Sequence, residues 1–189
     1  MTFAIQLLAV AGLTAVSTLS AADTPPPPGD GVAQAVAAIA DARMVGTPPG
    51  LGRILQIPDL ETKLTWTALV GDERNPSFHA RYKPTNSPLG IIELSLHYDT
   101  RLSLIGDRRA KMLVRLVLDF EKDKCPIQAE LAAALHTRAS VFPMPGYDGG
   151  PGYVLTTFNV PQPRSQPVRV SFVGANTCEL TISQDREIV

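Results

Sequence analysis

The longest regular pattern of apolar and polar residues in the chain runs from Lys111 to Arg138. Its first half alternates in the period-two manner of a β-strand, with apolar residues at Met112, Val114, Leu116, Leu118 and Phe120. Leu113 and Val117 make the opposite side partly apolar as well. We therefore expect a strand in the middle of a sheet, covered at least in part on both faces.

The second half of this stretch changes to a helical period. Pro126 suits the first helical position, because the missing N–H of proline breaks no intrahelical hydrogen bond there. We expect a helix over Pro126–Arg138 that buries Ile127, Leu131, Ala134 and Leu135. At about 100° per residue, His136 falls on the solvent side of this helix. Helical spacing of apolar residues predicts another helix from Val32 to Met44.

A second alternating stretch, Ile91–Ile105, precedes the strand that begins at Lys111, and Gly106-Asp107 between them is a turn signal. This order predicts an antiparallel hairpin. Both strands carry their apolar residues at even numbers, so the numbers of two paired residues must add to an even sum. That parity requires a connection of odd length or a bulge. A three-residue turn would place Asp99 opposite Arg115 as a cross-strand ion pair.

Shorter alternating stretches predict the remaining strands. Trp66 lies on the apolar side of the stretch Lys63–Val70, and we expect it in the core, with ligand stacking as the alternative. The other stretches are Ser77–Lys83, Tyr153–Val160, Val168–Val173 and Cys178–Ser183. The pattern predicts one α+β domain over residues 31–189, a mostly antiparallel sheet of five to six strands with two helices packed on it. The crossover through the helix after Pro126 allows one parallel strand pair.

The first 22 residues contain no charged side chain. An apolar run from Phe3 to Val16 is followed by Ser20-Ala21-Ala22, which predicts a signal peptide cleaved after Ala22. The prolines of residues 23–30 predict a semi-rigid spacer. We therefore expect a periplasmic or secreted protein, without stable membrane insertion once the signal peptide is removed. The alternative is a retained anchor and a membrane-tethered structural component of the envelope.

The charge of the chain indicates which partners it can bind, and its cysteines indicate a disulfide. The chain has 17 basic and 18 acidic residues, so no basic excess predicts binding to nucleic acid or to an anionic membrane. The only two cysteines of an exported chain predict a single disulfide, Cys125–Cys178.

Motifs for catalysis or metal binding are missing from the sequence. His79, His97 and His136 share no metal-ligand spacing, so we predict neither a metal nor a cofactor. The chain has no G-x-S-x-G, P-loop or G-x-G-x-x-G motif, which favours a non-enzymatic protein while leaving enzymatic activity open. A small-ligand carrier or an envelope hydrolase would need a cleft beside Trp66 or His97, lined by residues such as His79, Glu93 and Asp99.

The stretch Ser140–Tyr153 combines many prolines and glycines with aromatic residues. Proline and glycine predict a loop, and its apolar residues either fold back over the sheet or form a recognition surface. The candidate partner-binding residues are Phe142, Met144, Tyr147, Asp148 and Tyr153. The leading hypothesis is an exported protein-binding module, such as an inhibitor, an immunity-type protein or an envelope-assembly accessory, whose partner is another protein.

Overall fold

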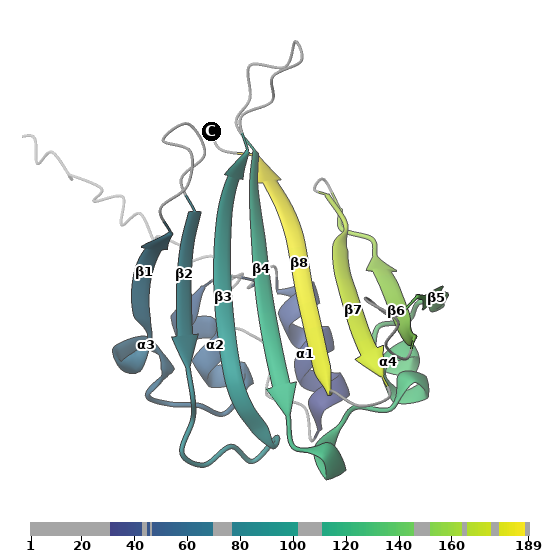
Figure 1. The fold of residues 1–189 in the computed structure, drawn as a ribbon, viewed down its shortest axis with the longest axis horizontal. Helices are drawn as coiled ribbons and strands as arrows, with labels where there is room; N and C mark the ends of the chain where they lie inside the picture. Colours follow the sequence, from purple (N-terminus) through teal and green to yellow (C-terminus); the bar gives the residue numbers. More distant parts are fainter. Residues whose placement is uncertain are drawn as a thin grey trace, which may run out of the picture.

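The computed structural model describes residues 31–42, 45, 47–69, 77–101, 111–145, 152–163, 166–174 and 178–187. These residues form one antiparallel sheet of eight strands, four α-helices and one 3-10 turn (Figure 1). The predicted α+β fold with a mostly antiparallel sheet is confirmed, but the sheet has eight strands rather than five or six, and four helices rather than two are present. The predicted signal peptide and spacer lie outside the described residues.

The sheet order is β1-β2-β3-β4-β8-β7-β6-β5. The strands are β1 (Thr65–Leu69), β2 (Ser77–Tyr82), β3 (Ile91–Arg101), β4 (Lys111–Phe120), β5 (Ser140–Met144), β6 (Tyr153–Val160), β7 (Val168–Gly174) and β8 (Glu179–Glu187). The helices are α1 (Val32–Asp41), α2 (Pro48–Ile54), α3 (Leu60–Lys63) and α4 (Gln128–Ala134), and the 3-10 turn is Lys122–Lys124. All seven strand pairings within the described residues are antiparallel, so the parallel pair that the crossover allowed is not among them.

The last strand lies in the middle of the sheet, between β4 and β7. It extends past the predicted stretch Cys178–Ser183 and continues to Glu187 in register with β4. One buried side chain and one hydrogen bond hold this end of the strand. The Gln184 side chain is buried, and the Arg186 guanidinium donates to the Val45 carbonyl at 2.6 Å.

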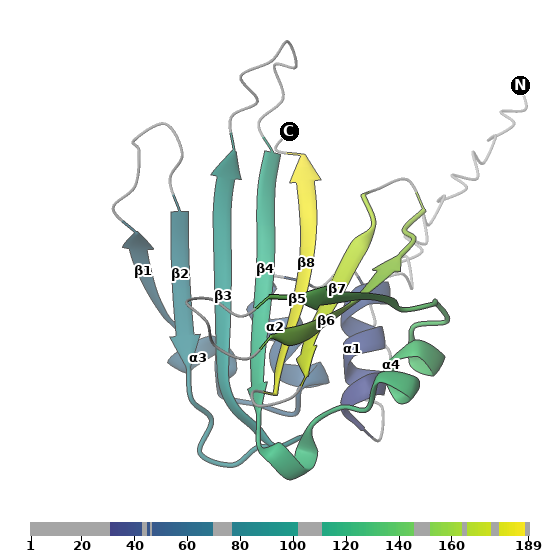
Figure 2. The ribbon, with the colours of Figure 1, turned by 45° about the vertical axis from the view of Figure 1, so that its right-hand side comes forward.

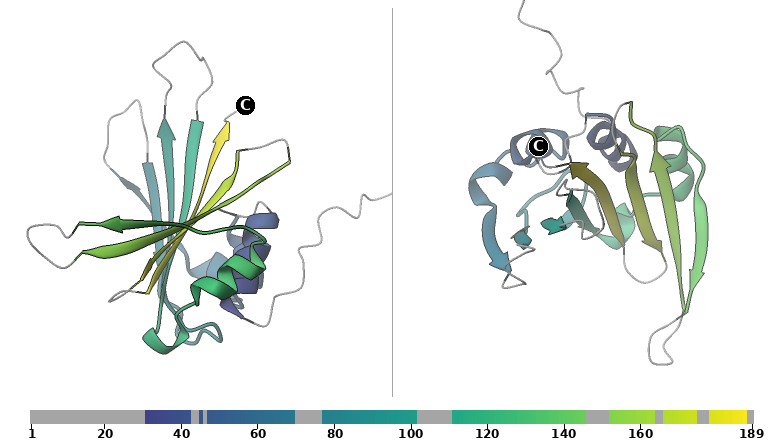
Figure 3. Two further views of the ribbon diagram at one scale, coloured as in Figure 1. Left: turned by 90° about the vertical axis from the view of Figure 1, so that its right-hand side faces the viewer. Right: turned by 90° about the horizontal axis from the view of Figure 1, so that it is seen from above.

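The helices cover one face of the sheet and leave the other without helical cover (Figures 1 and 3). Even-numbered side chains of the central strands point to the helices and form the core, among them Leu94, Leu96, Leu116, Leu118, Val170, Leu180 and Ile182. Helix α1 is rich in buried alanine, so its backbone can approach the sheet closely. We call the other side, which carries the odd-numbered side chains, the open face. The β5–β6 hairpin turns out of the sheet toward this side (Figures 2 and 3).

The β3–β4 hairpin has the predicted parity. Leu96 pairs with Leu116 and His97 with Arg115, and the bulge near Ile92 lies at the far end of the hairpin. The register differs by two residues from that of a three-residue turn, so Asp99 lies opposite Leu113 and not opposite Arg115. The ion pair still forms on the diagonal, with 3.2 Å between Arg115 Nη2 and Asp99 Oδ2.

Helix α4 begins at Gln128, two residues later than expected. Cys125 precedes a proline and has an extended backbone, as residues before proline prefer. Ile127 is also extended and is 59% exposed, so its predicted burial is wrong. Leu131 and Leu135 are buried and His136 is exposed, as predicted.

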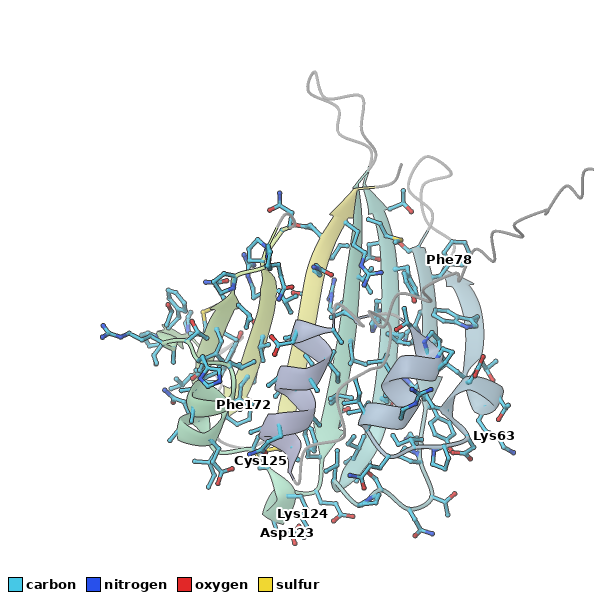
Figure 4. All side chains as sticks on the ribbon, turned by 180° about the vertical axis from the view of Figure 1, so that it is seen from behind. Lys63, Phe78, Asp123, Lys124, Cys125 and Phe172 are labelled. Carbon is cyan, nitrogen blue, oxygen red and sulfur yellow. A yellow bond between two sulfur atoms is a disulfide. The ribbon has the colours of Figure 1, made fainter. Side chains whose placement is uncertain are left out.

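The predicted disulfide Cys125–Cys178 is present, with 5.6 Å between the Cα atoms. It joins the segment after β4 to the residue before β8, close to the 3-10 turn (Figure 4). Next to it, the Phe120 N–H donates to the Cys178 carbonyl at 3.0 Å. The bridge therefore holds two neighbouring strands of the sheet at the same end.

We predict that replacing both cysteines by serine lowers the free energy of unfolding by about 4 kcal/mol, because the bridge closes a long loop in the unfolded chain. The measurement is urea denaturation of the double variant beside the oxidised native chain. A loss below about 1 kcal/mol, the size of an ordinary point mutation, would contradict this role.

Candidate functional site

The stretch Ser140–Tyr153 is not simply a loop, because its first five residues form β5, which pairs with β6 and ends the sheet. Pro143 is compatible with this place, since an edge strand has a side that donates no ladder hydrogen bond. Val141 and Phe142 are 52% and 50% exposed. Of the two alternatives for the apolar residues of this stretch, folding back over the sheet therefore does not apply to these two side chains.

The β5–β6 hairpin is apolar on both of its sides. Phe142 lies opposite Leu155 on the open face, whereas Val141 lies opposite Thr156 on the other side. Val154 of β6 is also exposed. Because the hairpin leaves the plane of the sheet (Figure 2), the helices do not cover its second side.

The five candidate residues have different environments. Phe142 is exposed, while Met144 and Tyr153 are half-buried and lie opposite each other at the end of the hairpin. Tyr147 and Asp148 lie outside the described residues. Sequence analysis missed Val141 and Val154, since an alternation interrupted by Pro143 after three residues is too short to indicate a strand.

The open face arranges its polar side chains in rows that cross the strands. Strand pairing places His79 beside His97, His97 beside Arg115, Arg115 beside Ser183, and Ser183 beside Arg169. This set of five residues is called the basic row below. It runs from β2 to β7 through the middle of the sheet.

His79 and His97 stack on each other, with 4.4 Å between the ring centroids and 18° between the ring planes. His79 Nε2 is buried and has no hydrogen-bond partner among the described residues. Burial lowers the pKa of His97 most, and the neighbouring His79 and Arg115 lower it further, against the opposing effect of Asp99. The two imidazoles are far apart in sequence, so only the β2–β3 register brings them together.

We predict that the folded state loses stability as the pH falls below about 6.5, the ordinary pKa of histidine. Because the pKa of His97 is lowered in the folded state, the unfolded chain binds more protons in this range, and acidification favours it. The measurement is the urea midpoint as a function of pH, and His97→Gln should flatten the decline.

His136→Asn is the matched control, because His136 is exposed and has a left-handed backbone that asparagine tolerates. An equal flattening by both substitutions would show that the stacked pair is not responsible.

Carboxylates occupy another row of the open face, in which Glu93 lies opposite Asp119 and Asp119 opposite Glu179. Arg81 Nε and Lys83 Nζ hold the Glu93 carboxylate at 2.7 and 3.1 Å. Burial raises the pKa of Asp119, and the negative charge of Glu93 raises it further. These contacts are those of a charged sheet surface, in which cations compensate carboxylates on adjacent strands.

The described residues line three cavities at the surface of the protein. One of about 600 Å³ lies beside the β2–β3 connection and includes Ser87 and Ile92. A groove of about 420 Å³ lies on the open face over β4, β8, β7 and β6, and a smaller pocket of about 130 Å³ adjoins it at Arg169. None of the three is lined by His79, His97, Glu93 or Asp99. Within the described ranges, no group of three or more His, Cys, Asp or Glu residues could hold a metal ion.

The predicted core position of Trp66 is wrong, since its side chain is 43% exposed. Trp66 belongs to the edge strand β1 and contacts the Tyr98 ring with 5.2 Å between centroids. Phe78, on the neighbouring strand, lies beyond the end of the helical layer (Figure 4) and is exposed as well. These aromatic side chains point to the helical side, but the helices do not extend over them.

No protein-family model, curated protein or solved structure matches this chain. Across the described part of the chain, no helix has the length and apolar character needed to cross a bilayer. A function is therefore inferred from the chain's own surfaces.

Proposed function

We propose that the chain is an exported, non-enzymatic protein-binding module whose partner contacts the β5–β6 hairpin. The observation that carries this proposal is the exposure of Val141 and Phe142 on an edge strand that projects from the sheet. Val154 on the adjacent strand is exposed on the same side of the hairpin as Val141. Large exposed apolar side chains that gather in one place are characteristic of interaction sites.

The composition of the hairpin suits a protein partner better than a small ligand. An aromatic side chain flanked by aliphatic ones is the usual centre of a protein interface. None of the three cavities has Val141, Phe142 or Val154 in its lining. A projecting hairpin that is apolar on both of its sides is complementary to a partner's groove.

Pro143 limits how the partner can bind. The strand has only three residues before this proline, and proline has no N–H to donate to an added strand. Prolines on edge strands also prevent uncontrolled pairing with other chains. We therefore propose that the partner recognises the side chains of the hairpin instead of extending the sheet by strand addition.

Two features support an exported location. Disulfides such as Cys125–Cys178 persist in oxidising compartments. The first 22 residues have the features of a signal peptide. An inhibitor, an immunity-type protein or an assembly accessory of the periplasm or cell exterior fits both features. The partner is another protein, and the proposal includes no cofactor or metal.

We predict that Val141→Ser combined with Phe142→Ser abolishes partner capture, because it removes most of the apolar surface of β5. The tagged chain is isolated from the cells that produce it naturally, and co-purifying proteins are identified by mass spectrometry. The supporting result is a protein bound by the native chain and absent with the double variant.

Ile92→Ser is the matched control. Ile92 is 49% exposed and lies at a bulge of β3, a strand that β4, β8 and β7 separate from the hairpin. A partner that is lost with Ile92→Ser as readily as with the hairpin variant would refute the assignment to the hairpin.

We also predict that the mature protein begins at Asp23, because cleavage after Ala22 follows the small residues that signal peptidase requires. Intact-mass measurement of the protein isolated from its natural source gives the N-terminus directly. A mass that retains residues 1–22 would favour the tethered alternative.

A further inference from the structure

The groove of about 420 Å³ on the open face begins beside the proposed hairpin surface. Leu155 lines the groove and lies directly opposite Phe142 of β5. The size is within the range of about 300–1,000 Å³ that is usual for ligand sites. A partner seated on the hairpin therefore has access to the groove without crossing another element of the described fold.

The chemical character of the groove lining changes from aliphatic to basic along the strands. At one end, Val173 and Leu155 provide an aliphatic wall, and further along the hydroxyls of Ser171 and Thr181 lie beside Val117. The next step is the part of the basic row in which Ser183 is flanked by arginines on both sides. The aliphatic wall and the basic row are four residues apart along β7, which corresponds to about 13 Å.

The two arginines leave donors available to a ligand. Arg115 contacts Asp99 through Nη2, but a guanidinium has further N–H groups. Arg169 is exposed and has no ion pair among the described residues. Both side chains line the groove on either side of Ser183.

Carboxylates lie on both sides of the basic row along β8, and they restrict a bound anion to the basic row. Asp185 lies one step beyond it, and Glu179 lies beside the aliphatic wall at the other end. An acidic group displaced in either direction along β8 would meet one of these like charges. The groove therefore selects for the position of a negative charge as well as for its presence.

An extended peptide matches these steps, because side chains on one of its faces recur about every 7 Å. Two side chains four positions apart then span the distance between the basic row and the aliphatic wall. We propose that this groove binds an extended segment of the protein partner, with an acidic side chain at the basic row and an aliphatic side chain against Leu155 and Val173. This inference rests on the proposed function and assigns the chemistry of the bound segment.

The test uses capped octapeptides on a serine and threonine background and the full mature chain, with binding measured by fluorescence polarisation. One position carries Glu, Gln or Lys, and the position four residues away carries Leu or Ala, in both orders. We expect the Glu/Leu peptide to bind about fivefold tighter than the Gln/Leu peptide, in the upper range for an exposed ion pair. It should also bind tighter than the Glu/Ala peptide, which buries less apolar surface. The Lys/Leu peptide should bind weakest.

Arg169→Gln should remove the preference for Glu over Gln. Arg53→Gln is the matched control, because Arg53 is an exposed arginine of α2, on the helical side of the sheet. Equal binding of the Glu and Gln peptides, or the same loss with both arginine variants, overturns the groove assignment.

Peptide binding and partner capture together separate the groove from the hairpin. If no octapeptide binds while partner capture still depends on Val141 and Phe142, the groove inference is wrong and the hairpin function stands. If the Glu/Leu peptide binds with the expected dependence on Arg169 while partner capture is indifferent to the hairpin, the hairpin function is wrong and the groove remains a peptide site.

Discussion

The register of β3 against β4 is the constraint on which the rest of the structure depends. Side chains alternate between the faces of a sheet, so a slip of one residue would move the core side chains of the slipped strand to the open face. The observed register keeps Leu96 and Leu116 on the helical side and His97 and Arg115 on the other. Strand β8 pairs with β4 in turn, and the disulfide holds the ends of these two strands together.

The pairing of β3, β4 and β8 gives the two faces of the sheet different compositions. On the helical side, it gathers the leucines, isoleucines and valines into the core. On the open face, it aligns the basic row and places the groove beside the projecting β5–β6 hairpin. The helices stabilise one side and leave the other accessible. The open face and the hairpin are together the recognition surface that we propose for this protein.

Sequence reasoning succeeded where the signal was local and strong. The long alternation of residues 91–101 and 111–120 indicated the central hairpin and its parity. The helices after Thr47 and Asp59 were missed because they are short and Pro58 interrupts their pattern. The candidate surface was anticipated only in part, since Phe142 was named but the strand that carries it was not.

The sequence by itself determined the α+β class, the disulfide and the division of the central strands into an apolar and a polar side, because each depends on residue types or on a period of a few residues. Only the tertiary structure decided that β8 inserts between β4 and β7, that His79 stacks on His97, and that Trp66 remains exposed. These features depend on pairings between distant segments and on how far the helices extend over the sheet. Local periodicity carries no information about either.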